Sequence, residues 1–589
     1  MVSNLYARAG RLASALVAIL LGSASCINID STLGSNFIPT DQIWNVYACP
    51  DEVLNDITLR QSDSLSGYSS RRLCFGSVRD DNFTSDKSTC FTLVPLADSM
   101  DFGTETQLIQ FHFTAIRDTL SFLYESEENI LQNVYVYPLN EALDSTILYA
   151  NAFSRQEIFD RYVDTTNGTI TEGIPVYNGG DSLSFNFSAA YTSSVINGIK
   201  SWQNLPEDKR DSLKFYLEAV PGIYICTDRS RGKGGRINMF ELPIKAADGY
   251  IEGNYAELKI RAKYDGKTEF TDTSFLFYFG PSEFLADDAT SYPSQYAFNA
   301  SNNTENAADF IKDWENASSR EYLYVEGGCG VKPVVPAREI HAIVEKLIAE
   351  HAPETDPDDI VINKATIILP YSNIGTAYSR LDTYPVILSP TVKLTSDSDK
   401  YVSYAGLTDS SIESENQGDI NRSLCIYSPD VSHHVQEIAK LKQKEGESDK
   451  EFEARLKKYD IWFLIMHEEI TESSSSTGAY DDYYNNLLYN SYYNNMMYDP
   501  YGYGYGYGYG YGGYGYGGYG YDGYGYNNYY NYMMMAQYAS ASSSSASSSS
   551  IELDTDRFYN AVLNGPDYGS DIKDKPRLKI TFSTPKSAE

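Results

Sequence analysis

Short runs of apolar residues, or of alternating apolar and polar residues, recur along most of the chain. Turns rich in Asn, Asp, Gly, Ser and Pro separate them, and typical runs are Val134–Tyr137 and Thr366–Leu369. Runs of this length and spacing are typical of strands in β-sandwiches and barrels. They do not alternate with helical segments, which argues against a doubly wound parallel sheet. The pattern therefore predicts a mainly β protein with a few short helices.

Two segments have a helical pattern instead. Residues 336–350 place five apolar side chains on one helical face: Ile340, Ile343, Val344, Leu347 and Ile348. Residues 433–458 are rich in charged side chains. We expect the first segment to pack against the core and the second to be largely exposed.

The chain also contains an internal repeat. SLSFNFSAAYTSSVINGI, which starts near residue 182, resembles SLCIYSPDVSHHVQEI, which starts near residue 423. A charged helical segment follows each copy, and then an apolar strand, predicted at Leu213–Leu217 in the first copy and Ile461–Met466 in the second.

Each half then closes with an alternating segment, YAELKIRAKY at 255–264 and PRLKITFST at 576–584. The repeat predicts two related β-sandwich-like domains, residues 40–265 and 266–589, which are joined near residues 265–275.

A long insertion, residues 473–550, interrupts the second domain. It is rich in Tyr and Asn, continues into Tyr-Gly repeats and ends in a serine tract, with four aspartates and no Lys or Arg. Alternating glycine removes the side chains that a sheet would pack and adds backbone entropy, so we predict a disordered low-complexity loop. An alternative is a tether that self-associates or contacts glycans, because tyrosine rings stack on each other and on sugar faces.

The first 25 residues have the pattern of a secretory signal. Arg8 and Arg11 precede the apolar run Leu12–Leu21, and Ser23-Ala24-Ser25 leads to Cys26. The apolar run is too short to span a bilayer, and no later window of about 18 apolar residues occurs. We expect Cys26 to become a lipid-carrying N-terminus that holds the protein at a membrane.

Charge and cysteine content narrow the class further. The formal net charge is −34, which argues against nucleic acid and against electrostatic binding to anionic lipid headgroups. Six cysteines remain beside Cys26, and an oxidising compartment could pair them. They could equally be small buried hydrophobic residues.

Several local motifs resemble parts of known functional sites. His467-Glu468-Glu469 lacks the second histidine of HExxH and is expected at the end of a strand. His433-His434 are adjacent, so on a helix they point in different directions. Ser230–Arg236 is basic and glycine-rich but lacks a phosphate-loop pattern, so a hairpin loop is expected. Gly327–Gly330 is expected to form a tight turn rather than a site for a nucleophilic Cys329.

Two further features leave alternatives open. Asp356–Asp359 could hold calcium, although it lacks the register of an EF-hand. A sugar-stacking residue could be among the four tryptophans Trp44, Trp202, Trp314 and Trp462. No residue is assigned to catalysis, to a cofactor or to a metal.

Motifs spread over the mature chain resemble those of a known family. They are Leu33–Pro39, Phe75–Asp81, Val134–Leu139, the Tyr149–Asn151 pair, Tyr322–Gly328 and Ile362–Ala365. The chain resembles the Bacteroidota lipoproteins grouped as domain of unknown function 4270. The resemblance implies an exported, β-rich, outer-membrane lipoprotein whose anchor and entry segment span residues 26–39. None of these motifs is catalytic, and the Tyr-Gly insertion departs from the family pattern.

The sequence therefore predicts a lipid-anchored envelope protein that is not an enzyme and needs no cofactor. Its role would be binding or structural, with a glycan or an envelope protein as partner, on either face of the membrane. Two alternatives stay open. One is a glycan-active enzyme with two carboxylates across a cleft. The other is a scaffold assembled by the Tyr-Gly insertion.

Overall fold

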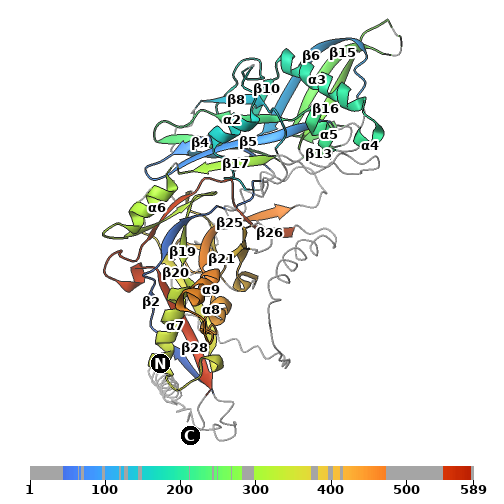
Figure 1. The fold of residues 1–589 in the computed structure, drawn as a ribbon. Helices are drawn as coiled ribbons and strands as arrows, with labels where there is room; N and C mark the ends of the chain where they lie inside the picture. Colours follow the sequence, from blue (N-terminus) through green and yellow to red (C-terminus); the bar gives the residue numbers. More distant parts are fainter. Residues whose placement is uncertain are drawn as a thin grey trace, which may run out of the picture.

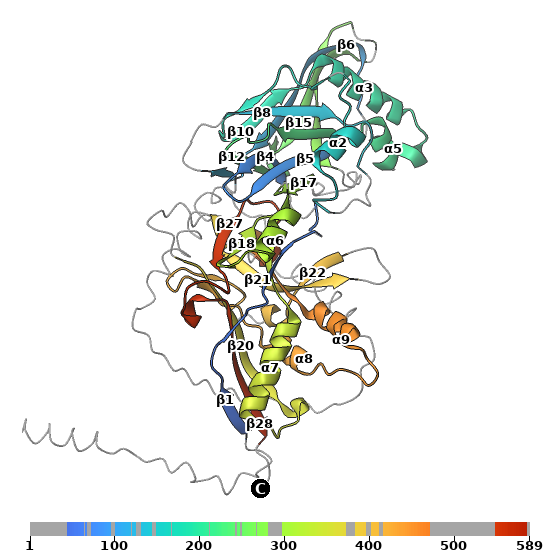
Figure 2. The same ribbon diagram turned by 60° about the vertical axis from the view of Figure 1, so that its left-hand side comes forward.

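The protein has two lobes, which lie end to end (Figures 1 and 2). The computed structural model describes residues 44–585 apart from 281–296, 373–382, 472–547 and shorter gaps of six residues or fewer. The described residues form several antiparallel sheets with a few short helices, so the predicted fold class is confirmed. The signal segment, Cys26 and most of the 473–550 insertion lie outside the described residues.

Lobe I comprises residues 72–303. Its elements are β4 (Arg72–Arg79), β5 (Thr84–Pro95), β6 (Thr104–Ile116), β7 (Phe122–Tyr124), β8 (Gln132–Pro138), α2 (Arg155–Tyr162), β9 (Val176–Tyr177), β10 (Ser182–Asn186), α3 (Ala189–Gln203), α4 (Glu207–Arg210), α5 (Leu213–Ala219), β11 (Ile223–Thr227), β12 (Gly234–Glu241), β13 (Ile244–Ala247), β14 (Tyr250–Gly253), β15 (Tyr255–Lys263), β16 (Thr271–Gly280) and β17 (Phe298–Asn303).

The long strand β5 joins two layers in lobe I. Its last four residues pair with β16, in the layer β10–β6–β15–β16, whereas residues 89–91 pair with β11, in the layer that also contains β8. Phenylalanines from both layers form one core together with α3 and α5, and they include Phe91, Phe113 and Phe279. The rings of Phe113 and Phe279 stack 5.0 Å apart.

Lobe II comprises residues 44–61 and 307–585. Its elements are β1 (Trp44–Ala48), β2 (Glu52–Val53), β3 (Thr58–Gln61), α6 (Ala307–Glu315), β18 (Tyr322–Glu326), β19 (Val331–Val335), α7 (Ala337–His351), η3 (Pro357–Asp359), β20 (Val361–Pro370), β21 (Ile387–Thr395), β22 (Val402–Gly406), η5 (Thr408–Ser411), β23 (Ile420–Asn421), β24 (Ile426–Tyr427), α8 (Ser432–Ala439), α9 (Asp449–Leu456), η6 (Lys457–Tyr459), β25 (Ile461–Thr471), β26 (Ser548–Leu553), β27 (Asn560–Asn564), η7 (Ile572–Asp574) and β28 (Arg577–Pro585).

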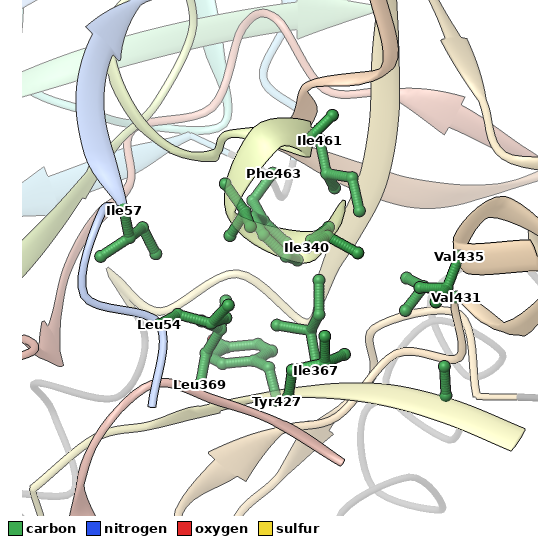
Figure 3. Packing of buried hydrophobic residues seen from close by; sticks show 14 of the residues in the cluster. Leu54, Ile57, Ile340, Ile367, Leu369, Tyr427, Val431, Val435, Ile461 and Phe463 are labelled. Carbon is green, nitrogen blue, oxygen red and sulfur yellow. The ribbon is translucent and has the colours of Figure 1, made fainter. Parts of the chain in front are cut away.

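Helix α7 is the centre of the lobe II core. It corresponds to the predicted helix 336–350, and its five predicted apolar residues are all buried. Figure 3 shows Ile340 among side chains from both large sheets, including Phe463 of β25 and Ile367 of β20. The sheets are β1–β28–β20–β24–β23 and β22–β21–β25–β19–β3. Within the described residues, no helix has the length and hydropathy needed to cross a membrane.

The two halves of the sequence share one order of elements and one pairing scheme. The order β10–α3–α5–β11 in the first half matches β24–α8–α9–β25 in the second. In each half the strand before the first helix pairs with a strand, β6 or β20, that also pairs with the closing strand, β15 or β28. Both β6 and β20 have a register shift against that closing strand. The halves are therefore related in topology, as the sequence repeat suggested.

Three local predictions need correction. Leu213–Leu217 lies in helix α5 because Tyr216 and Val220, one helical turn apart, are both buried, and the Tyr216 hydroxyl donates to the Leu93 carbonyl at 2.5 Å. The segment 433–458 forms two helices, and α8 buries Val435 and Ile438 instead of being exposed. The insertion ends earlier than expected, since residues 548–550 pair with β25 as part of β26.

Each half of the sequence gives its first strands to the other lobe. Strands β1 and β3 from the first half pair with β28 and β19 in lobe II, and β16 and β17 from the second half pair with β15 and β5 in lobe I. The boundary at 265/266 falls between β15 and β16, so it divides the repeats. It does not divide the lobes, because this strand exchange is reciprocal.

The lobes also insert side chains into each other. Phe83, in the turn between β4 and β5, enters the core of lobe II, where its ring lies 5.3 Å from Phe310. Phe558 of lobe II packs against Cys74 and Ile237 of lobe I. The Lys87 ammonium donates to the Thr555 carbonyl across the junction, at 2.8 Å. The strand exchange is thus reinforced by apolar and polar contacts.

Candidate functional site: a groove lined by cationic side chains

A groove with a volume of about 720 Å³ lies on lobe II, beside the crossing segments that lead to lobe I. Strand β3, helix α6, the α9–η6 turn and the strands β21 and β25 supply its walls. The lining residues are Leu59, Arg60, Gln61, Asp63, Ala308, Ile311, Glu315, Lys393, Ala454, Lys457, Lys458, Asp460 and Trp462. Four of these residues are cationic and three are acidic, which contrasts with the net charge of −34 for the whole chain.

Local structure fixes the walls of the groove. Strand β3 is the last strand of its sheet, and α6 packs beside it. Helix α9 begins with a capping box, in which the Ser448 hydroxyl accepts from the Glu451 amide and the Glu451 side chain returns to the Ser448 amide. The helix continues into the 3₁₀ turn η6, which places Lys457 and Lys458 directly before β25.

Three of the four cations in the groove are available to a ligand. Arg60, Lys457 and Lys458 are exposed and form no side-chain hydrogen bond or ion pair within the described part of the chain, although the Asp460 carboxylate interacts with the charges of Arg60 and Lys457. Lys393 differs, because its ammonium pairs with Asp63 at 2.5 Å and lies 5.3 Å from the centre of the Trp462 ring. Lys393 thus has a structural partner, and the other three cations form the binding part of the groove.

The acidic residues of the groove are mostly committed to structure. Asp460 accepts a hydrogen bond from the Ala337 amide at 2.9 Å, at the start of α7, and burial raises the pKa of this carboxyl. Asp63 pairs with Lys393. Glu315 is exposed on α6. Asp460 and Asp63 thus have partners within the fold, whereas Glu315 faces solvent.

Beside the groove, a buried polar cluster surrounds the turn Gly327–Gly330, which connects β18 to β19 as the sequence suggested. The Glu326 carboxylate accepts from the Thr304 hydroxyl at 2.7 Å and from the Asn303 amide at 3.2 Å. The Lys332 ammonium donates to the Gly328 carbonyl at 3.0 Å and also to the Glu326 carbonyl.

This cluster belongs to the scaffold. Burial raises the pKa of Glu326 and lowers the pKa of Lys332, since each charged form loses solvation there. The Ser62 hydroxyl donates to the Gly330 carbonyl at 3.1 Å, so the first crossing segment is tied to the turn. Sequence reasoning missed Glu326 and Lys332. The available signal was a pair of charged residues that flank a glycine-rich turn between apolar strands.

Burial raises the thiol pKa of the cysteines in the core. Burial raises the pKa of the Cys329 thiol to about 11, so the thiolate is disfavoured at neutral pH. The six cysteines in the described residues are unpaired, and five of them are buried. They act as small core residues, which is one of the two alternatives that the sequence left open.

Cations at the basic loop Ser230–Arg236 are paired with carboxylates. Arg229, just before it, pairs with Asp86 at 3.2 Å, and Lys233 within it pairs with Asp81 at 2.7 Å. The expected hairpin is also absent, because the flanking strands β11 and β12 pair with other strands and not with each other.

The candidate metal ligands are separated or already paired. At the Asp356–Asp359 segment, where the sequence allows a calcium ion, the Lys442 ammonium bridges Asp356 at 3.1 Å and Asp358 at 2.7 Å. His434 is buried with its Nε2 2.9 Å from the Tyr459 carbonyl, and burial lowers its pKa to about 4, whereas His433 is exposed. Among the described residues, no group of three His, Cys, Asp or Glu side chains could hold a metal ion.

The remaining candidates take different positions. His467–Glu469 lies within β25, paired with β26, and not at a strand end as expected. Trp462 forms part of the groove wall but is nearly buried, Trp202 and Trp314 are core residues, and Trp44 is exposed at the far end of lobe II. Cys26 lies outside the described residues.

A scan against family models, a search of curated proteins and a search of solved structures found no match to this chain. The family resemblance seen in the motifs therefore stays a prediction.

Proposed function

We propose that this protein is an exported, lipid-anchored envelope protein that binds an acidic glycan in the lobe II groove without transforming it. The observation that carries the proposal is the set of exposed cations, Arg60, Lys457 and Lys458, on a strongly acidic protein. The net negative charge of the protein repels anions in general. A ligand with closely spaced negative groups would be favoured, because it can contact the cations of the groove together.

The chemistry of the walls supports a sugar. Ala308 and Ile311 offer apolar surface for the C–H faces of sugar rings, and the three cations lie within reach of carboxylates on the same ligand. An extended peptide would usually add to a free sheet edge, but α6 packs beside β3, the last strand of this sheet. Exposed charge pairs contribute up to about 1 kcal/mol each, so we expect weak binding that salt reduces.

The envelope location rests on the sequence. The signal segment, Cys26 and the resemblance to domain of unknown function 4270 all support export and lipid attachment. The formal charge of −34 makes direct electrostatic binding to anionic headgroups unfavourable, so a lipid on Cys26 would hold the protein at the membrane.

Polygalacturonate, a carboxylated polysaccharide, is a suitable probe. We expect it to bind the purified protein in calorimetry, and the Lys457→Glu/Lys458→Glu variant to weaken binding at least tenfold. A control with the same net charge is Lys444→Glu/Lys450→Glu, whose lysines are exposed near α9 but outside the groove. Equal loss in both variants, or equal binding of neutral dextran, would overturn the groove assignment. Cleavage of polygalacturonate would overturn the non-enzymatic role.

A further inference from the structure

The outer face of the β1–β28–β20 sheet is apolar at one end. Trp44 and Val46 on β1 are 45% and 64% exposed, and Val361 on β20 is 43% exposed. In the strand register, Val46 and Val361 lie on either side of Ser583, and Trp44 lies opposite Pro585. Residues directly opposite in a sheet point to the same face, so these side chains form one patch. We call Trp44, Val46 and Val361 the end patch.

The patch is not an extension of the core. Residues that alternate with it point inward, where Tyr47 lies opposite Phe582 and their rings are 5.2 Å apart. Further along the outer face the residues become polar. Lys364 pairs with Asp430 at 2.5 Å, and Lys579 is exposed. A solvent-facing sheet surface is normally polar throughout, so an apolar end indicates that something covers it.

The place of the end patch in the molecule favours a lipid surface. Trp44 and Pro585, the first and last described residues, are paired at the end of lobe II, and lobe I lies at the opposite end (Figures 1 and 2). Residues 27–43 connect this end to Cys26. Seventeen residues reach at most about 60 Å when fully extended, so a lipid on Cys26 keeps the patch close to the bilayer.

We propose that the end patch inserts into the interfacial layer of the membrane that carries the lipid anchor. The inference rests on the proposed lipid attachment at Cys26. Tryptophan prefers the headgroup level, where its apolar ring and its N–H group are both accommodated. The tether makes this contact intramolecular, so a few partly buried side chains are enough to populate it. Lobe II then stands on the membrane and lobe I projects away from it.

Trp44 reports this contact directly. The other three tryptophans, Trp202, Trp314 and Trp462, are at most 8% exposed, so lipid-borne quenchers reach Trp44 first. The lipidated protein is reconstituted in phosphatidylcholine vesicles whose acyl chains are brominated near the headgroup. We expect bromination to quench the fluorescence of the wild-type protein, and the Trp44→Phe variant to lose this quenching while it still cosediments with vesicles. The Val46→Glu/Val361→Glu variant should still cosediment with vesicles, but brominated lipid should quench its fluorescence less than that of the wild-type protein.

The outcomes separate the two proposals. Cosedimentation without quenching of Trp44 would overturn the membrane contact and leave the anchor intact. Absence of quenching together with crosslinked dimers through β1 would show that a second copy covers the patch and would also overturn it. If Cys26→Ala cosediments as well as the wild type, the proposed anchor fails instead.

Discussion

Glu339 is a buried carboxyl that couples the stability of lobe II to pH. It lies in the first turn of α7, where Oε1 accepts from the Asp56 amide at 2.8 Å and Oε2 has no hydrogen-bond partner among the residues that the structure describes. Burial raises its pKa to about 7. Because the folded state binds this proton more tightly than the unfolded chain, Glu339 stabilises the fold below its unfolded pKa. That contribution is lost as the pH rises through about 7.

We predict that Glu339→Gln gains stability relative to the wild type between pH 5 and pH 8. Glutamine keeps the acceptor for the Asp56 amide but carries no charge to desolvate. Each pKa unit corresponds to about 1.4 kcal/mol, so the difference in the free energy of unfolding should change by up to about 3 kcal/mol over this range. Urea titrations of the variant and the wild type at pH 5 and pH 8 measure this difference in the free energy of unfolding. Glu350→Gln, exposed on the same helix, serves as control, and a parallel pH profile for both variants would refute the assignment.

The individual residues of the groove show why it was not predictable from the sequence. Its available cations, Arg60, Lys457 and Lys458, come from β3 and from η6, which are remote in sequence and belong to no local motif. Trp462 was singled out from the sequence as a possible sugar-stacking residue, but its ring is nearly buried in the groove wall. The sequence shows which residue types are present, whereas the exchange of strands between the lobes determines which of them meet in the groove.

At the scale of elements, the turn between β18 and β19 depends on the absence of side chains. A Cβ atom on Gly327 would lie 2.5 Å from the Arg557 carbonyl and 2.8 Å from the Tyr559 amide nitrogen. Its backbone does not require a positive φ, so the constraint is one of space. Close backbone contact of this kind holds the irregular segment 554–559, which leads to β27, against the turn.

We therefore expect Gly327→Ala to destabilise the protein by about 1–3 kcal/mol, the usual cost of overpacking. Chemical denaturation measures the change. Gly232→Ala is the matched control, because a Cβ there meets nothing within 4 Å and its φ is not positive. Equal effects of the two substitutions would show that the turn tolerates a side chain.

Elements with a strong local period were predictable. The strands around Val134–Tyr137 and Thr366–Leu369 and the helix at 336–350 all occur as the sequence indicated. The strand predicted at Leu213–Leu217 was wrong, because five residues with alternating polarity also fit a short helix. Only the packing against α3 distinguishes the helix from the strand. The local sequence pattern predicts the type of a long element, whereas tertiary contacts determine whether a short segment forms a helix or a strand.

At the scale of the whole molecule, the reciprocal strand exchange makes the two lobes interdependent. Strands β16 and β17 occupy in lobe I the places that β1 and β3 occupy in lobe II, as in a domain swap within one chain. The repeat was visible in the sequence, but the exchange was not, because hydrophobic alternation does not specify which of two equivalent strands a sheet receives.

The exchanged strands are not interchangeable. The first half brings Leu54, Ile57 and Leu59 into the lobe II core, and all three are fully buried. The second half places Phe298 in lobe I, together with the buried polar residues Asn299 and Asn303, which bond to Cys74 and Glu326. Each lobe would therefore lose specific contacts if it closed with its own first strands.

We predict that residues 27–266 and 267–589, produced as separate chains, fold only together. Residues 27–266 lack β16 and β17 of lobe I, and residues 267–589 lack β1, β2 and β3 of lobe II. Each fragment alone therefore leaves apolar core residues exposed and should show no cooperative unfolding transition. Mixing should restore one transition and a 1:1 complex, which calorimetry and analytical ultracentrifugation would detect. A full chain cut after folding, by a protease site placed at Gly266, where a Cβ meets nothing within 4 Å, should remain associated in native buffer. Cooperative unfolding of either monomeric fragment would show that a lobe closes with its own strands, and the exchange would then not be required for folding.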